Sequence, residues 1–207
     1  MKAYISPDMQ EKIDFYRSMR RPEAIPFFNF PAIPPSQRLT YIPLGYENFE
    51  VLFDLFKADD NRFVNPEFKD KERIGIYVVG LKEFAKYSPK RGAHDWILYH
   101  EEVPVGILHL YDFSKEKHGG KHQKCTIGFA IAKPYRRLGF GAEAIAQGIN
   151  YIFSNFESVN CIMAYTYLDN EASIGILTKL GFLPNTSDYS HHSRYAFFEK
   201  FRQILSE

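Results

Sequence analysis

Apolar residues along the chain recur with two periods, and each period predicts one kind of element. Short runs that are continuously apolar, or that alternate between apolar and polar residues, are typical of β-strands, whereas apolar residues three or four positions apart indicate one face of an α-helix. The first pattern predicts strands at 38–44, 95–100, 105–113, 124–131, 160–167, 182–183 and 194–201. The second pattern predicts helices within 1–20 and at 46–56, 74–85, 142–156 and 170–180.

The order of these elements indicates the fold class. Three successive strands between 95 and 131 predict an antiparallel meander, and the helix at 142–156 then connects two further strands. This order predicts an α/β fold, loosely α+β, in which helices flank one central, mostly antiparallel sheet. A stretch rich in proline and phenylalanine, 22–35, suits an extended segment. We therefore expect residues 1–35 to be an N-terminal extension packed on a domain of residues 36–207.

Charge and cysteine content restrict the class of protein. With 26 basic and 25 acidic residues the net charge is +1, so bulk charge does not favour nucleic acid or a membrane as a partner. The only two cysteines, Cys125 and Cys161, lie in apolar runs and are predicted to be buried thiols rather than a disulfide. No apolar stretch reaches the length of a membrane span. We expect a cytoplasmic protein, either a monomer or a homodimer.

A basic, glycine-containing turn at 134–144 separates an apolar strand from an amphipathic helix. The first amides of such a helix have no partners within the helix and lie at the positive end of its dipole, so they can bind a phosphate. Gly139 and Gly141 remove side chains that would keep an anion away from those amides. Arg136 and Arg137 add positive charge, although a solvated surface pair without a ligand is the alternative for these arginines. We interpret the turn as an anion-binding site.

Four blocks of residues carry a resemblance to a known family. They are, in chain order, Ile127-Gly128-Phe129-Ala130-Ile131, Gly139-Phe140-Gly141-Ala142-Glu143-Ala144, Asn170-Glu171-Ala172-Ser173 and Lys179-Leu180-Gly181-Phe182. Together they resemble the acyl-CoA site of the GNAT superfamily of N-acetyltransferases. Within it they look most like the RimJ/RimL-type branch, which includes ribosomal-protein N-terminal acetyltransferases. The likeness covers residues 38–183.

The resemblance implies a strand-turn-helix site that holds acetyl-CoA as cosubstrate. It implies that the pyrophosphate is held by Arg136, Arg137, Leu138, Gly139, Phe140, Gly141 and Ala142, that the pantetheine pairs with a splayed strand at Phe129, Ala130 and Ile131, and that Asn170 and Ser173 contact its other side. It also implies direct attack of a primary amine on the acetyl group in a ternary complex. The acceptor would be a protein or peptide N-terminus, or else a small-molecule amine such as a polyamine or aminoglycoside.

The usual catalytic residues of this superfamily are missing. The position of its tyrosine general acid is Leu177, and a glutamate base used by some relatives would fall near Cys125 or Thr126. Replacement candidates lie on the strand at 105–113, and we select His109 and Asp112, with Tyr111 beside them. A histidine side chain can exchange protons near neutral pH, although a hydrogen-bonded sheet histidine is the alternative for His109.

The sequence indicates the residues that recognise the acceptor amine less specifically than those that bind acetyl-CoA. An acidic segment could attract a cationic amine or basic peptide, or be no more than a solvated loop; its residues are Asp59, Asp60, Glu67 and Asp70. The histidines His118, His122, His191 and His192 have no convincing metal-ligand spacing, so we expect no metal. Because Leu177 replaces the usual acid, a non-catalytic acyl-CoA-binding module stays the rival of the enzyme. Nucleotide binding is disfavoured because the turn lacks the lysine and serine or threonine of a phosphate-binding loop.

Overall fold

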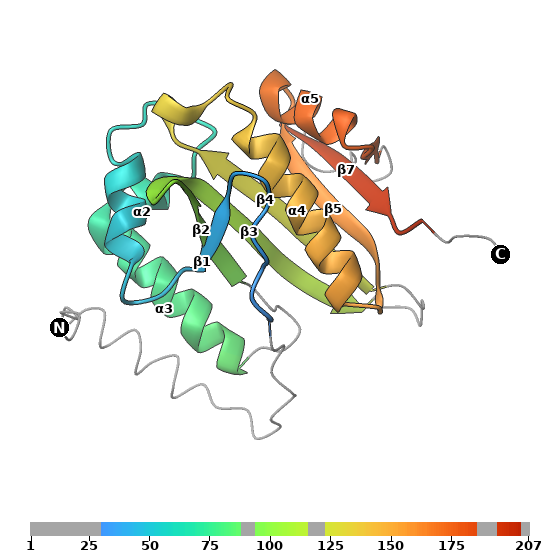
Figure 1. Ribbon diagram of the computed structural model, residues 1–207, viewed down its shortest axis with the longest axis horizontal. Coiled ribbons are helices and arrows are strands. Elements are labelled where there is room, and N and C mark those ends of the chain that lie inside the picture. The colour runs from blue at the N-terminus through green and yellow to red at the C-terminus, as the bar shows by residue number, and fades with distance from the viewer. Residues whose placement is uncertain (1–29, 88–93, 116–122, 186–193, 204–207) are drawn as a thin grey trace.

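The computed structural model describes residues 30–87, 94–115, 123–185 and 194–203. Within these ranges a seven-stranded sheet carries helices on both faces (Figure 1). The strands are β1 (Thr40–Pro43), β2 (His94–His100), β3 (Val103–Lys115), β4 (Gln123–Ile131), β5 (Val159–Tyr167), β6 (Leu183–Pro184) and β7 (Tyr195–Phe201). The helices are α2 (Phe49–Phe56), α3 (Lys71–Tyr87), α4 (Phe140–Asn155) and α5 (Glu171–Lys179), with short 3-10 helices η1 (Pro66–Lys69) and η3 (Lys133–Tyr135).

The sheet has the strand order β1-β2-β3-β4-β5-β7-β6. Its neighbouring strands are antiparallel except for the pair β4 and β5, which run parallel because α4 connects them across one face. Strands β2, β3 and β4 form the predicted meander. The fold class predicted from the sequence is therefore confirmed: a mixed, mostly antiparallel sheet flanked by helices.

Two predicted helix boundaries shift for local reasons. The helix predicted to start at residue 46 begins at Phe49, because Asn48 closes a turn before it: its Oδ1 accepts from the Gly45 amide at 2.8 Å and its Nδ2 donates to the Pro43 carbonyl at 2.9 Å. The helix predicted at 142–156 begins earlier, at Phe140, directly after Gly139 with its positive φ of 86°. Helix α5 begins after Asn170, as predicted, with the Asn170 side chain accepting from the Ser173 amide.

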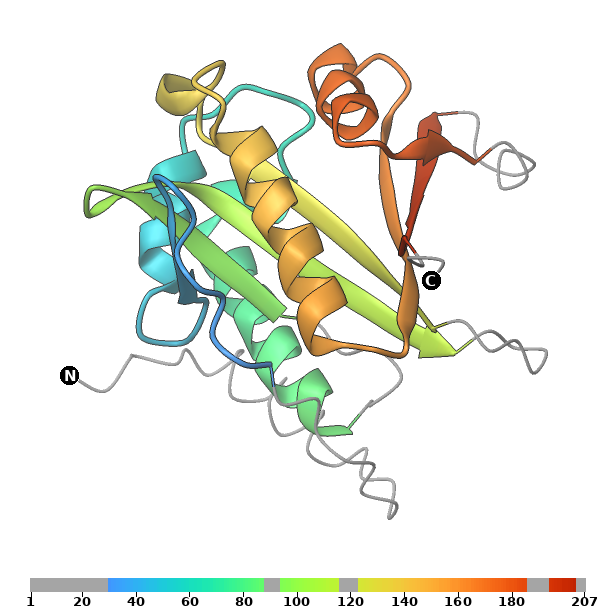
Figure 2. The ribbon, with the colours of Figure 1, turned by 45° about the vertical axis from the view of Figure 1, so that its right-hand side comes forward.

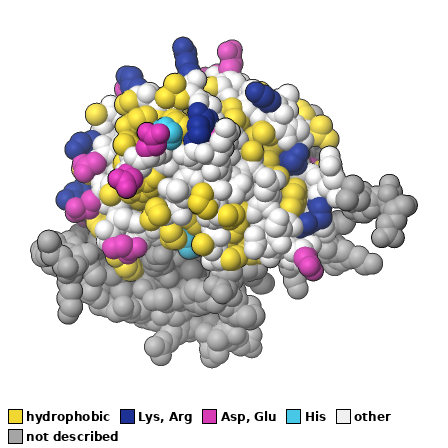
Figure 3. Space-filling model, viewed as in Figure 1, with side chains coloured by type: hydrophobic (Ala, Val, Ile, Leu, Met, Phe, Trp, Pro, Cys, Tyr) yellow, Lys and Arg dark blue, Asp and Glu magenta, His cyan; other side chains and the backbone are white. Residues whose placement is uncertain are grey.

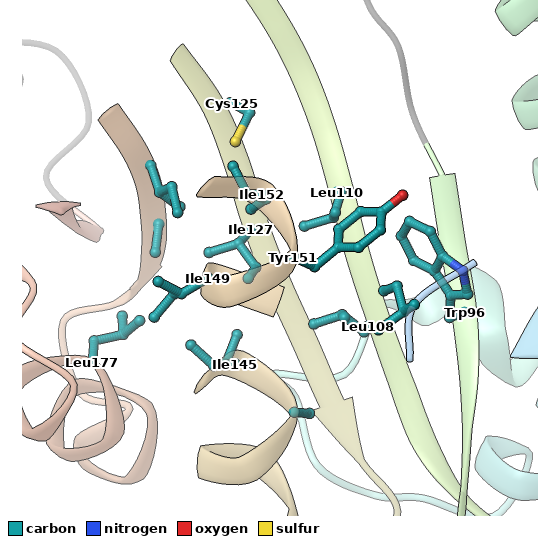
Figure 4. Packing of buried hydrophobic residues seen from close by; sticks show 14 of the residues in the cluster. Trp96, Leu108, Leu110, Cys125, Ile127, Ile145, Ile149, Tyr151, Ile152 and Leu177 are labelled. Atoms are coloured by element: carbon teal, nitrogen blue, oxygen red, sulfur yellow. The ribbon is translucent and has the colours of Figure 1, made fainter. Parts of the chain in front are cut away.

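Alternating side chains of the central strands fill two separate core layers. Leu98 and Leu108 belong to the layer beneath α4, whereas Ile97 and Ile107 belong to the layer beneath α2 and α3, as expected for side chains that alternate across a sheet. Figure 4 shows the first layer, in which Ile127 of β4 packs among residues of α4. Helix α4 approaches β4 closely at Gly148, where an added Cβ would lie 2.6 Å from Cδ1 of Ile127.

Strands β4 and β5 are paired over only part of their length. Their register runs from Gln123–Val159 to Thr126–Met163, and beyond Thr126 β4 continues to Ile131 paired with β3 alone. The two strands therefore part from residue 127 onward, and the V-shaped gap opens toward the N-terminal end of α4 (Figure 2). This parting is the splayed strand that the resemblance implied at Phe129 to Ile131.

The segment that precedes β1 runs along α4. Phe30 packs against Trp96, Phe113 and Phe156 with ring centroids 6.1, 5.3 and 5.6 Å away, and the Tyr151 hydroxyl donates to the Pro31 carbonyl at 2.7 Å. Residues 1–29, with their predicted helix, lie outside the described ranges. The boundary between an extension and the domain stays a prediction. His118, His122, His191 and His192 also lie outside the described residues.

Candidate active site

The turn before α4 has the backbone shape of an anion site. Arg137 and Gly139 adopt positive φ values of 63° and 86°, and Gly139 is the N-terminal cap of the 16-residue helix α4. The backbone N–H groups at the start of α4, from Phe140 to Ala142, have no hydrogen-bond acceptor within the helix, as in any α-helix. Leu138 is 53% exposed at the tip of the turn. The anion-binding interpretation therefore fits the local geometry, and the individual phosphate contacts stay predictions.

An ion pair between segments distant in sequence supports this turn. The Glu143 carboxylate accepts from the Ser36 hydroxyl at 2.7 Å, from the Arg38 amide at 2.6 Å and from Arg38 Nε at 2.8 Å. Arg38 Nη1 in turn donates to the Leu138 carbonyl at 3.0 Å. Burial raises the pKa of Glu143, but the hydrogen bonds from Ser36 and Arg38 outweigh it and hold the pKa below its ordinary value. Arg38 thus braces the turn, a role without a local sequence signal.

The guanidinium of Arg136 points into the protein rather than toward the turn. Its Nε donates to the Ile131 carbonyl at 2.9 Å, and its Nη2 pairs with the Asp59 carboxylate, whose side chain is only 2% exposed. This arrangement ties the end of β4 to the segment after α2. The side chain that we expected at the pyrophosphate is therefore committed to a buried ion pair, and the carbonyl of Ile131 has an internal partner.

Gly141 is required for packing. An added Cβ would lie 2.7 Å from Cε2 of Phe129 and 3.3 Å from Cδ1 of Ile176. We had attributed this glycine to phosphate access alone, but the ring of Phe129 occupies the space that a side chain would need. A substitution at Gly141 would therefore displace Phe129 as well as alter the turn.

A cleft of about 660 Å³ opens where β4 and β5 part. It brings together the predicted residues Phe129, Ala130, Asn170 and Ser173 with the catalytic candidates His109 and Asp112, and with Tyr111 and Leu177. Its lining comes from α3, η1 and the segment before it, β2, β3, β4, β5, α5 and β7: Phe63, Asn65, Glu67, Phe68, Ile76, Tyr77, Gly80, Leu81, Asp95, His109, Tyr111, Asp112, Ile127, Gly128, Phe129, Ala130, Ala164, Tyr165, Thr166, Tyr167, Asn170, Ser173, Leu177 and Tyr195. Such a volume is typical of small-molecule sites.

His109 is held in the cleft by a buried carboxylate. Its Nδ1 lies 3.0 Å from Oδ1 of Asp95, and the Asp95 side chain is 2% exposed. The imidazole ring stacks on Phe68 with centroids 5.6 Å apart and planes 19° apart. Because a carboxylate accepts hydrogen bonds, the proton of the neutral imidazole is assigned to Nδ1, and in that tautomer Nε2 carries the lone pair. Nε2 has no protein partner among the described residues.

The second oxygen of Asp95 is also satisfied. The Tyr77 hydroxyl donates to Asp95 Oδ2 at 2.6 Å. Burial, and then the Asp95 charge, raise the pKa of Tyr77 well above its ordinary value, so the hydroxyl stays protonated and remains a donor. We did not predict Asp95 or Tyr77 as site residues. The available signal was an aspartate inside an otherwise apolar strand, since a buried carboxylate needs partners.

Asp112 and Tyr111 lie beside His109 on β3. Asp112 has a positive φ of 54° at a shift of register between Tyr111 and Ser114, so the strand bulges here and Asp112 is exposed at the cleft. Burial, followed by the adjacent Tyr165 hydroxyl, raises the pKa of Tyr111, which keeps its hydroxyl neutral. Leu177 is 2% exposed and takes part in the core, so its position offers no proton donor.

The amide of Asn170 is largely used to fix the start of α5. Its Oδ1 accepts from the Ser173 amide at 3.4 Å, and its Nδ2 donates to Thr166 Oγ1 at 2.9 Å. Both Asn170 and Ser173 line the cleft. They flank the parted strands from the side of β5, which is where the resemblance places them, and their contact with pantetheine stays a prediction.

The acidic segment contributes one carboxylate to the cleft instead of four. Asp59 pairs with Arg136, Asp60 accepts from Lys133 Nζ at 3.0 and 3.1 Å, and Asp70 caps α3 by accepting from the amides of residues 72 and 73, both at 3.0 Å. Only Glu67 of the four lines the cleft. The other three carboxylates have partners outside the cleft.

Charged groups outside the cleft are dispersed on the face that Figure 3 shows. Figure 3 shows acidic and basic side chains interspersed with apolar ones over the visible face. Among the described residues, no three His, Cys, Asp or Glu side chains are grouped to hold a metal ion. No described helix is long and apolar enough to cross a membrane. Cys125 and Cys161 are buried as free thiols, as predicted.

A mixed sheet that parts beside the N-terminus of a helix, with a cleft at the gap, is the arrangement that the resemblance to N-acetyltransferases implied. The acetyltransferase (GNAT) domain family matches residues 38–183, so the chain belongs to that family and is an acetyltransferase. The chain is 28% identical over 151 residues to the uncharacterized N-acetyltransferase YoaA of Bacillus subtilis (strain 168), covering 71% of this chain and 80% of YoaA.

Solved structures share this fold at low sequence identity. One is RimL, a ribosomal L7/L12 alpha-N-protein acetyltransferase in complex with coenzyme A, with a TM-score of 0.61, 14% identity, and coverage of 83% of this chain and 98% of RimL. Another is MccE, a microcin C7 self-immunity acetyltransferase in complex with acetyl-CoA and AMP, with a TM-score of 0.61, 15% identity, and coverage of 83% and 99%. The coenzymes bound by these proteins agree with acetyl-CoA, the cosubstrate expected from the sequence.

Proposed function

We propose that this protein transfers the acetyl group of acetyl-CoA to a primary amine, with His109 as the proton acceptor and a peptide or protein N-terminus as the acceptor class. The observation that carries the proposal is the pair of His109 and Asp95 in the cleft beside the parted strands. A base oriented by a buried carboxylate is a recurring arrangement for proton transfer.

The residues around the gap fit acetyl-CoA. The amides at the start of α4 would hold the pyrophosphate, and the unpaired edge of β4 beyond Thr126 would receive the pantetheine. Acetyl-CoA supplies the activated acetyl group: the thioester C–S bond breaks as the amine nitrogen forms the C–N bond, and the sulfur leaves as a thiolate that becomes the thiol by taking up the proton that the amine lost. Direct attack in a ternary complex requires both substrates in one cleft, and the cleft has room for their reacting ends.

His109 and Asp95 handle the proton in this reaction. The lone pair on Nε2 accepts the proton that the amine loses, and the Asp95 carboxylate stabilises the resulting imidazolium through Nδ1. Asp112, exposed at the same cleft, is the second candidate, and it would attract the cationic amine. Neither role requires a tyrosine at the position of Leu177.

A peptide N-terminus is favoured over a lysine side chain by acid-base chemistry. An α-amine has a pKa of about 8 and is partly neutral at pH 7, whereas a lysine amine near 10.4 is almost wholly protonated. RimL, which shares the fold, is described as an alpha-N-protein acetyltransferase. This likeness supports the proposed acceptor class.

The test is turnover of the full chain with acetyl-CoA and a panel of amines, followed by release of the free CoA thiol. Replacing His109 with Gln should lower kcat by about 10² to 10⁴-fold, while calorimetry should give an unchanged Kd for CoA. An Asp112→Asn variant assayed in parallel separates the two candidates. CoA binding without turnover of any amine would instead establish a non-catalytic binding module. Full activity of His109→Gln would show that His109 is not the proton acceptor.

A further inference from the structure

The carboxylates that face the cleft are few. Asp95 is occupied by His109 and Tyr77, and in the acidic segment only Glu67 lines the cleft, accepting from Asn65 Nδ2 at 3.3 Å. Asp112 is the other described carboxylate there. A cleft with only two such carboxylates among the described residues suits an acceptor with a single positive charge. A polyamine with several ammonium groups needs more partners spaced along its length.

Aromatic side chains form the largest group in the cleft lining. Tyr165 of β5 is 50% exposed, and its ring lies edge-on to Tyr111 and Tyr195, with centroids 6.3 and 5.9 Å away. Tyr167 and Phe63 continue this surface, with their ring centroids 5.5 Å apart. Such rings offer apolar area to an uncharged group and a negative face to a cation.

An open space on α3 lies in the same cleft. Gly80 lines the cleft, and an added Cβ would find no atom within 4 Å. Glycine is a poor helix former, and no packing contact among the described residues requires it at this position. The missing side chain leaves the α3 wall of the cleft open at this position, and we call this opening, which Ile76 and Leu81 of the same lining adjoin on α3, the recess. A recess with apolar flanks suits a bulky apolar group on the acceptor.

We infer that the acceptor is a primary amine with one positive charge, attached to an apolar or aromatic group that occupies the recess at Gly80 and contacts Tyr165. Glu67 and Asp112 attract the ammonium form, and His109 removes its proton at the reacting position. This inference rests on the proposed function, because it assigns the acceptor of the same reaction. It makes Gly80 and Tyr165 residues that determine specificity.

The panel to test it contains a peptide with N-terminal Phe, the same peptide with N-terminal Ser, phenethylamine and spermidine. The Phe peptide or phenethylamine should exceed both the Ser peptide and spermidine in kcat/KM by at least about ten-fold. Comparison of the Phe peptide with phenethylamine distinguishes a peptide from a free arylalkylamine. A preference for spermidine, or for the Ser peptide, would overturn the inference while leaving acetyl transfer itself established.

Gly80→Leu fills the recess, and Gly175→Leu is its matched control. Gly175 lies in helix α5, also has no atom within 4 Å of an added Cβ, and does not line the cleft. Gly80→Leu should raise KM for the aromatic amine at least about ten-fold, with a smaller change for glycinamide, while Gly175→Leu matches the native chain. Tyr165→Ala should weaken the same acceptor, and Tyr165→Phe should retain it. Equal KM values for Gly80→Leu and Gly175→Leu would refute the assignment.

Binding gives a readout that does not depend on turnover. Calorimetry of the CoA-saturated protein should detect the Phe peptide or phenethylamine, and Gly80→Leu should abolish the heat of binding while Gly175→Leu preserves it. Absence of binding of both compounds to the native chain would overturn the inference. Absence of turnover despite specific binding would instead contradict the proposed function.

Discussion

Nδ1 of His109 on β3 lies 3.0 Å from Oδ1 of Asp95 on β2, and the two residues are direct cross-strand partners in the sheet. The antiparallel register places them opposite each other on the face that carries α3, where the Tyr77 hydroxyl reaches the same carboxylate at 2.6 Å. Three elements thus fix one imidazole. The orientation of His109 is set by the sheet and not by a flexible loop, which favours a reproducible position of Nε2.

Replacing Asp95 with Asn should lower kcat by about 10²-fold or more. The imidazolium form of His109 loses the carboxylate that stabilises it, and the tautomer of the neutral imidazole is no longer fixed. The Kd for CoA should stay unchanged. Tyr77→Phe keeps the carboxylate and removes one donor, so it should reduce kcat less and cost about 1–3 kcal/mol of unfolding free energy. Steady-state kinetics and urea unfolding of both variants check the order. Equal kcat for Asp95→Asn and the native chain would disprove the positioning role.

Glu143→Gln should lower the unfolding free energy at pH 7 by roughly 1–3 kcal/mol, because the charged acceptor of Ser36 and Arg38 is lost. The folded pKa of Glu143 lies below its ordinary value, so this contribution is present above about pH 4.3 and disappears as the pH falls through the folded pKa. Urea unfolding at several pH values should show the two proteins converging in acid. Asp54→Asn, in an exposed pair with Lys57, is the control and should change stability by less than about 0.5 kcal/mol. A gap that widens in acid would contradict the assignment.

Arg136→Met should cost about 3–5 kcal/mol of unfolding free energy, because the buried Asp59 carboxylate loses its cation and keeps only the hydrogen bond from the Asn61 amide. Adding Asp59→Asn should recover much of the lost unfolding free energy. Any loss of CoA affinity in Arg136→Met should be recovered in the same double variant. Arg137 is exposed on the turn, so Arg137→Met should weaken CoA binding without a comparable loss of stability. If the double variant of Arg136 and Asp59 is stable but binds CoA at least about ten-fold more weakly than the native chain does, the Arg136 guanidinium contacts the pyrophosphate after all.

Gly141→Ala should destabilise the protein by about 1–3 kcal/mol, because its methyl group would overlap the ring of Phe129. The matched control is Gly175→Ala in α5, where the added methyl group meets nothing within 4 Å and should stabilise the helix by up to about 1 kcal/mol. Thermal unfolding of the two variants tests this contrast. Equal stabilisation by both substitutions would show that Phe129 moves aside without cost.

The sequence alone determined most of the elements and indicated acetyl-CoA as the cosubstrate. The period of apolar residues located the meander, and it placed the start of the helix after the glycine turn within two positions of Phe140, because these features depend on neighbours a few positions away along the chain. The same local logic placed the last helix at 170–180 and gave the fold class. His109 was a candidate because its residue type suits proton transfer and its strand was expected to face the substrate.

Only the tertiary structure decided which polar groups are available for chemistry. Asp59 is 77 positions from Arg136, and Arg38 is 105 positions from Glu143, so no local pattern could pair them. These contacts remove Asp59 and the Arg136 guanidinium from the groups free to meet a ligand, while cross-strand register brings Asp95 to His109. Burial explains the difference: a charge removed from water must find a partner, and the fold determines which residue is close enough to be that partner.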